Sequence, residues 1–170
     1  MNNIEKGIID LLNCTIRGDK LSNKNLAGIA LEKFIDRARE HSISGLLYSA
    51  IDWHYEVNEN KELINDWKLS TFYTGVGQLN HINQVEKIIK KFNEENVRVI
   101  VLKGLVVREF YKNPELRTMS DADILVHEED LDKARNILTS LGYSEKEGSD
   151  EHGAHLVFDH TNYLNSHHNL

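Results

Sequence analysis

Apolar side chains in the first half of the chain recur every three or four residues, the spacing of one face of a helix. This pattern covers residues 4–15, 26–38 and 43–53, and a long stretch from about Lys61 to Asn93. We assign the apolar stripe of the long stretch to a core: Leu63, Ile64, Trp67, Phe72, Val76, Leu79, Ile82, Val85, Ile89 and Phe92. The sequence therefore predicts a helical N-terminal part over residues 1–95.

The pattern changes at Asn96. Residues 97–102 (VRVIVL) are β-branched and almost continuously apolar, which is typical of a central strand. Further strands are predicted in ADILVH, YSEKE and AHLVFDH, and helices in LVVREFYKN and EEDLDKARNILTSLG. The order β-α-β-α-β-β over residues 96–170 indicates an α+β protein whose second part carries the sheet.

Composition narrows the function classes. A chain of 170 residues fits one compact domain, or one domain with a small helical subdomain. The formal net charge of −7 disfavours bulk nucleic-acid binding, because a phosphate backbone attracts a basic face. The single cysteine, Cys14, cannot form an internal disulfide, and no run approaches the roughly 18 apolar residues of a membrane-spanning helix. We expect a cytoplasmic protein without a membrane partner.

The stretch RTMSDADILV places two acids, Asp121 and Asp123, directly before an apolar strand. If the strand includes them, they share one face at a separation of about 6.5–7 Å. Two carboxylates at that separation can jointly hold a hard divalent cation such as Mg²⁺, whose charge removes their mutual repulsion. A solvated strand entrance gives the same short motif, so the pair alone does not decide between a metal site and a surface feature.

Lys103 and Gly104 stand between a predicted strand and a predicted helix, upstream of the acidic pair. A turn of this kind can present backbone N–H groups to a phosphate. Glycine allows the close approach, and lysine adds a compact positive charge. The order of strand, Lys-Gly, helix, Arg117 and then the acidic pair is much less common than either motif alone.

The stretch VIVLKGLVVREFYKNPELRTMSDADILV resembles the signature of the uncharacterised nucleotidyltransferase family within the polymerase-β-like nucleotidyltransferase superfamily. The helical segment ALEKFIDRAREHSISGLLYSAI is similar to the segment that precedes the catalytic half in that family. The residues that carry the resemblance are Leu102, Lys103, Gly104, Tyr111, Pro114, Arg117, Asp121, Ala122 and Asp123.

The resemblance implies a minimal nucleotidyltransferase-type mixed sheet flanked by helices, with Asp121 and Asp123 as catalytic ligands of two Mg²⁺ ions. Lys103 and the Gly104 amide would hold phosphates of a nucleoside triphosphate, and Arg117 would brace the aspartates or meet the triphosphate. The reaction implied is transfer of a nucleoside monophosphate to an acceptor hydroxyl, with release of pyrophosphate. The acidic charge favours a small-molecule or protein acceptor.

The end of the chain departs from the family pattern. Where the family has a third carboxylate, the best local match, LNSHHNL, offers Asn165, and the nearby alternative is Asp159 in a different register. Either the chain is truncated or it has lost full catalysis. The alternatives to an enzyme are therefore a catalytically impaired nucleotide-binding or protein-interaction module with the same fold, and a purely helical adaptor. The clustered histidines near the end indicate a zinc site only weakly.

Overall fold

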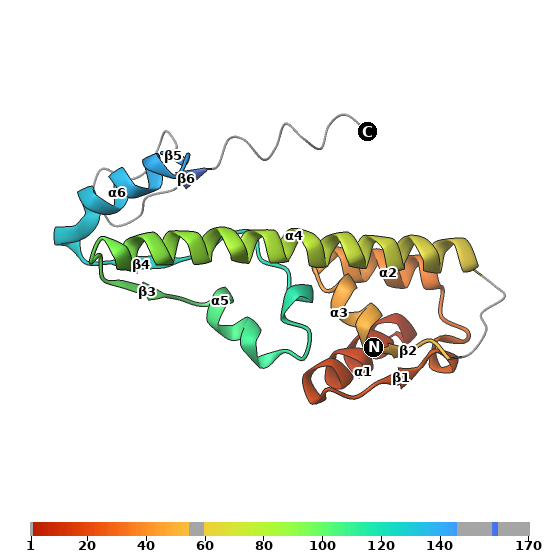
Figure 1. The fold of residues 1–170 in the computed structure, drawn as a ribbon. Coiled ribbons are helices and arrows are strands. Elements are labelled where there is room, and N and C mark those ends of the chain that lie inside the picture. Colours follow the sequence, from red (N-terminus) through yellow and green to blue (C-terminus); the bar gives the residue numbers. More distant parts are fainter. Residues whose placement is uncertain (1, 55–59, 146–157, 160–170) are drawn as a thin grey trace. The chain divides into compact units, whose positions relative to one another are not determined.

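The computed structural model describes residues 2–54, 60–145 and 158–159, and shows helices together with short strands (Figure 1). Contacts divide the chain into two compact units. Unit 1 comprises Met1–Asn83 and Leu102–Asp123, and unit 2 comprises Gln84–Val101 and Ile124–Leu170. The α+β class is confirmed. Each unit combines two segments that are separate in the sequence, so the units do not test a single division of the chain. The domain boundary expected at residue 95 therefore stays a prediction.

Unit 1 is built mainly from helices, as the apolar spacing predicts. The first helix begins with a reciprocal cap between Asn2 and Glu5 and ends at Gly18, whose φ of 74° suits glycine. A short parallel pair joins β1 (Leu21–Ser22) to β2 (Ile51–Asp52). The helices are α1 (Asn3–Arg17), α2 (Leu31–Glu40), α3 (Ser44–Ser49), the first part of α4 (Lys61–Glu94), α5 (Gly104–Val107) and the 3₁₀ helices η1 (Asn23–Leu26), η2 (Arg108–Phe110) and η3 (Pro114–Leu116).

Trp67 of α4 anchors the core of unit 1. Its side chain is fully buried and lies edge-on to Phe34 and Tyr48, with ring centroids 6.1 Å and 5.3 Å away. Its indole N–H donates to the carbonyl oxygen of Ser44 at 3.1 Å and to the hydroxyl of Ser44 at 2.8 Å. The single polar atom of the ring is thereby satisfied, so the ring buries its apolar area without leaving a donor unpaired.

Part of the stripe assigned to the core is exposed, and that assignment was wrong. Phe72, Val76 and Leu79 are 63%, 40% and 49% exposed. The face of α4 that packs inward after Trp67 instead continues through the buried residues Thr71 and Gly75, and Leu116 lies against Gly75. A hydrophobicity pattern cannot select this face, because its residues are small and not apolar.

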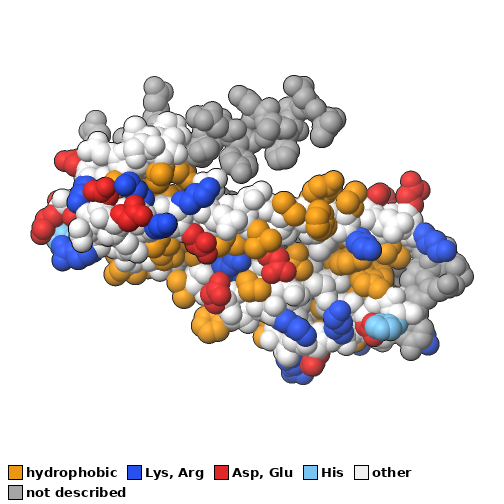
Figure 2. Space-filling view, viewed as in Figure 1, with side chains coloured by type: hydrophobic (Ala, Val, Ile, Leu, Met, Phe, Trp, Pro, Cys, Tyr) orange, Lys and Arg blue, Asp and Glu red, His pale blue; other side chains and the backbone are white. Residues whose placement is uncertain are grey.

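The exposed stretch of α4 does not make the helix a membrane span. Figure 2 shows hydrophobic side chains at the surface, interspersed with charged ones. Within the described ranges no helix, α4 included, combines the length and apolar composition that a membrane crossing requires.

Unit 2 packs a two-stranded ribbon against helices. β3 (Val99–Val101) and β4 (Ile124–Val126) run antiparallel, with Val101 opposite Ile124. One face of the ribbon joins the core made by the end of α4 and by α6 (Leu131–Ser140), while Ile100 and Leu125 on the other face are more than half exposed. The buried core residues are Ile88, Phe92, Val97, Ala134 and Ile137.

The described strands form three separate two-stranded sheets: β1–β2, β3–β4, and β5 (Ser144–Glu145) with β6 (Phe158–Asp159). The last pair is antiparallel and corresponds to the two C-terminal strands expected from the sequence. A single mixed sheet of the nucleotidyltransferase type stays a prediction.

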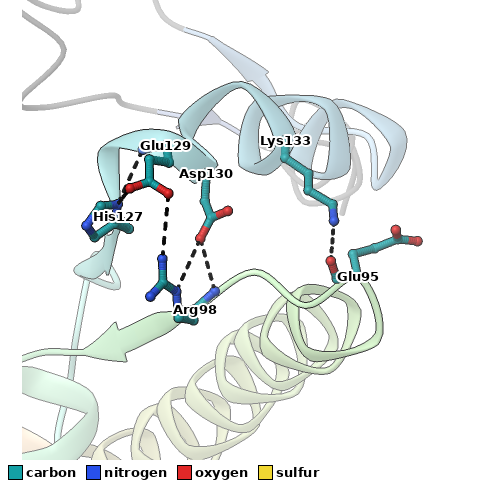
Figure 3. Close-up of polar contacts among 6 residues, drawn as sticks. All are labelled: Glu95, Arg98, His127, Glu129, Asp130 and Lys133. Carbon is teal, nitrogen blue, oxygen red and sulfur yellow. Dashed lines mark hydrogen bonds and ion pairs between the residues drawn. The ribbon is translucent and has the colours of Figure 1, made fainter.

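Polar contacts tie the start of β3 to η4 (Glu128–Asp130) and α6 (Figure 3). The Arg98 side chain reaches Glu129 at 4.0 Å and Asp130 at 3.9 Å, and its backbone N–H donates to Asp130 at 3.5 Å. Lys133 donates to the carbonyl oxygen of Glu95. These groups are mostly exposed, so they set local geometry and contribute little to the free energy of unfolding.

The buried and exposed aromatic residues of α4 allow a matched test of the core assignment. Trp67→Ala should lower the free energy of unfolding by about 3–5 kcal/mol, because it leaves a large cavity. Phe72→Ala should change it by no more than about 0.5 kcal/mol, because its ring is largely in solvent. Urea denaturation followed by circular dichroism measures both. Equal losses in the two variants would contradict the assignment.

Candidate functional site

The loop from Arg117 to Asp123 is held in place by contacts with the turn between α2 and α3 and with α4. The Thr118 hydroxyl donates to the carbonyl oxygen of Ser42. The Gln78 side chain of α4 makes a paired contact with the Met119 backbone: its amide nitrogen donates to the carbonyl oxygen, and its amide oxygen accepts from the N–H, both at 3.0 Å. Two consecutive residues, Thr118 and Met119, are therefore fixed one residue before the acidic pair begins.

Lys103 lies opposite the end of that loop. The N–H of Leu102 donates to the carbonyl oxygen of Asp123 at 3.0 Å, which extends the β3–β4 ladder by one residue pair. Beyond it the Lys103 ammonium nitrogen lies 3.0 Å from a carboxylate oxygen of Asp123. The backbone of Lys103 has a φ of 48°, a conformation that residues other than glycine rarely adopt.

The charge of Lys103 is stabilised by its acidic neighbours. The hydrogen bond to Asp123 is the main cause that raises the pKa of Lys103, followed by the Coulombic attraction of Asp123. Asp121 contributes a further Coulombic attraction, so it lies within electrostatic range of the same ammonium group. Because the pKa of Lys103 is raised above 10.5, Lys103 is a cation at neutral pH and loses its charge as the pH rises through the raised pKa.

Two side chains of the loop lie close against Gly104. A Cβ atom at this position would lie 2.9 Å from the Met119 sulfur and 3.4 Å from a guanidinium nitrogen of Arg117. A larger residue would push both side chains away from the start of α5. The glycine that was expected to let the backbone approach a phosphate thus packs against the loop, and the Arg117 side chain lies beside it.

Asp121 and Asp123 both precede β4, which begins at Ile124, so the condition that the strand includes them is not met. Asp121 is exposed and accepts from the Ser120 hydroxyl at 3.4 Å, whereas the Asp123 side chain is 28% exposed and faces Lys103. The described part of the chain holds no group of three or more His, Cys, Asp and Glu residues arranged to bind a metal ion. At this site the described residues that could offer a carboxylate to a cation are Asp121 and Asp123.

The candidates for the position of the third carboxylate in the family pattern are Asn165 and Asp159. Asn165 and the clustered histidines, His152, His155, His160, His167 and His168, lie outside the described residues. The backbone of Asp159 is described and pairs with Ser144 in the β5–β6 ribbon. The identity of the third acid therefore stays a prediction.

Sequence reasoning missed Gln78 altogether. A glutamine between apolar positions of a long helix has the pattern of a solvent-facing residue, and nothing in its neighbours indicates a distant backbone partner. The partner lies 41 residues further along the chain, so only the folded structure reveals it.

The positive φ of Lys103 leads to a stability prediction. Lys103→Gly and Lys103→Ala both remove the ammonium group, but only glycine relieves the backbone strain. The glycine variant should therefore exceed the alanine variant in free energy of unfolding by about 1–3 kcal/mol. Urea titration of the two proteins checks this difference. An alanine variant as stable as the glycine variant would show that the turn is not strained.

The part of the chain that carries the site matches a known protein family. Residues 28–170 match the model of a family described as an uncharacterised nucleotidyltransferase, and the match includes every residue of the site described above. Comparisons with curated proteins and with solved structures found no match. Because the family model covers most of the chain, this protein belongs to that uncharacterised nucleotidyltransferase family.

Proposed function

We propose that the protein is a Mg²⁺-dependent nucleotidyltransferase that moves a nucleoside monophosphate from a nucleoside triphosphate to an acceptor hydroxyl. One observation carries the proposal: two carboxylates, Asp121 and Asp123, lie next to a lysine that sits on a strained turn before a glycine. Membership of a nucleotidyltransferase family supports it. Acids and cations side by side are what a metal-bound polyphosphate requires.

The acidic pair has the chemistry to bind Mg²⁺. Carboxylate oxygens are the hard donors that this ion prefers, and one of them already attracts a cation, since the Lys103 ammonium group lies 3.0 Å from Asp123. Asp121 and Asp123 would hold the ion, and the bound ion would neutralise charge on the triphosphate and on the departing pyrophosphate. Lys103 can pair with a phosphate oxygen as readily as with a carboxylate.

The other residues of the site bind and orient. The Arg117 guanidinium, packed beside Gly104, offers several N–H donors to phosphate oxygens. In the proposed reaction the acceptor oxygen forms a bond to the α-phosphorus. The bond between the α-phosphorus and the oxygen that links it to the β-phosphorus breaks. Pyrophosphate leaves with that electron pair while the acceptor gives up its proton. A small-molecule or protein hydroxyl suits the net charge of −7 better than a nucleic acid.

The proposal predicts that a nucleoside triphosphate with Mg²⁺ stabilises the protein. At a ligand concentration about 100 times Kd, the melting temperature should rise by about 5–10 °C. The double variant Asp121→Asn with Asp123→Asn should lose the shift, because it keeps the shape of both side chains and removes both charges. Differential scanning fluorimetry with ATP, GTP, CTP and UTP measures the effect.

A double variant with the same charge change elsewhere is the control. Asp36 and Asp132 are exposed acids outside the site, so Asp36→Asn with Asp132→Asn should keep the full shift. No shift in the unaltered protein, or an equal shift in both double variants, would contradict nucleotide binding at this site. Pyrophosphate release with a panel of hydroxyl acceptors then separates an enzyme from a binding module, since binding without turnover favours the impaired-module alternative.

A further inference from the structure

One face of α4, within unit 1, is both apolar and exposed. Its five large side chains are 40–63% exposed: Leu69, Phe72, Tyr73, Val76 and Leu79. The rings of Phe72 and Tyr73 lie against each other, with centroids 5.8 Å apart. We call this surface the outer face of α4. Contiguous apolar surface on a water-exposed helix marks a site of interaction.

The outer face lies in a stretch of the helix without formal charge. Residues 69–85 contain no Asp, Glu, Lys or Arg, although these four types make up 28% of the chain. Lys68 precedes the stretch and Glu86 follows it. A helix face that stays in solvent normally carries charges, whereas the centre of a protein interface is poor in charge and rich in aromatic residues. The composition therefore favours a protein partner.

The spacing of the apolar residues is that of two paired helices. Four of them follow one another at intervals of three, four and three residues, as the a and d positions of a heptad repeat do: Leu69, Phe72, Val76 and Leu79. Asn83 takes the next such position after them and Asn65 the position before them, and both are exposed. An apolar stripe with this repeat fits a second helix that has the same repeat.

The stripe is symmetric about Thr74. Leu69 and Leu79 lie five residues before and after Thr74, and Phe72 and Val76 lie two residues before and after it. If a second α4 runs antiparallel and meets the first at Thr74, Leu69 lies level with Leu79 of the second copy. Phe72 then lies level with Val76, so a large side chain faces a smaller one in both central layers. The same surface on two copies is thus complementary to itself, as a twofold interface requires.

The distribution of charge favours a second copy of this chain. Two copies with a net charge of −7 repel each other, so they can meet only where the contact brings few like charges together. In the antiparallel arrangement Lys68, the charge that borders the stretch, lies level with the uncharged Asn80 of the second copy. A lipid surface would instead call for Lys or Arg beside the apolar residues, and residues 69–85 contain neither.

We propose that the outer face of α4 is a self-association surface, on which two copies of the chain pair antiparallel about a twofold axis near Thr74. The inference is independent of the proposed function. One pair of helices buries less than the roughly 1,600 Å² of a standard interface, so the Kd should be about 10–100 µM. Below that concentration the chain is a monomer, and Phe72 is exposed as described above.

Sedimentation equilibrium at protein concentrations from about 1 µM to about 500 µM measures the association. The mass should rise from that of one chain, 19.6 kDa, toward twice that value. Phe72→Lys and Val76→Glu should each raise the Kd at least about tenfold, because each places a charge among the apolar side chains of the stripe. Ile16→Lys is the matched control, since Ile16 is a 69% exposed residue of α1 and its replacement should leave the Kd unchanged.

A mixture of the two α4 variants tests the antiparallel orientation. When the Phe72→Lys protein meets the Val76→Glu protein, the introduced ammonium and carboxylate groups lie level with each other, and one layer of Phe72 with Val76 remains. The mixture should therefore associate about tenfold more tightly than either variant alone. This gain also shows that both variants are folded. In a parallel pair the two introduced charges lie in different layers, and the mixture gains nothing.

The outcomes decide the inference. An unaltered protein that stays monomeric at every concentration overturns it, and so does an association that neither α4 substitution weakens. A mixture that associates no better than its components overturns the antiparallel arrangement. A monomer that sediments with vesicles of phosphatidylcholine and phosphatidylglycerol would assign the outer face to a lipid surface and overturn the inference. None of these measurements involves a nucleotide, so each result leaves the proposed function to its own test.

Discussion

The ion pair between Lys103 and Asp123 is the interaction on which the rest of the site depends. It forms where the β3–β4 ladder ends, because the bond from Leu102 to Asp123 brings Lys103, the next residue after Leu102, close to Asp123. The turn at Lys103 requires a positive φ, and the following glycine admits the loop that carries Arg117. A backbone constraint thus brings acids and bases together, although they are about twenty residues apart in sequence.

The charges of this cluster balance only in part. Lys103 offsets Asp123 directly and Asp121 at longer range, and the Arg117 guanidinium lies against Gly104. A site that binds a metal with a polyphosphate has to accept both signs of charge at once. The two carboxylates would serve the cation, and Lys103 with Arg117 would serve the anion.

The sequence predicted the helices of unit 1 and the strands β3 and β4, because these depend on the local spacing of apolar residues. It did not predict the exposure of Phe72, Val76 and Leu79, since the inward face of α4 is chosen by the small residues Thr71 and Gly75. The role of Gln78 also escaped it, because its partner lies 41 residues further along the chain and is set only by the fold.

Paramagnetic broadening by Mn²⁺ in place of Mg²⁺ tests the central claim most directly. With a nucleoside triphosphate present, nuclear magnetic resonance spectra of ¹⁵N-labelled protein should lose amide signals first at Lys103, Gly104 and residues 121–123. That result would place the metal and the nucleotide at the acidic pair. Broadening centred elsewhere, such as the histidine-rich end of the chain, or no broadening at all, would contradict the account.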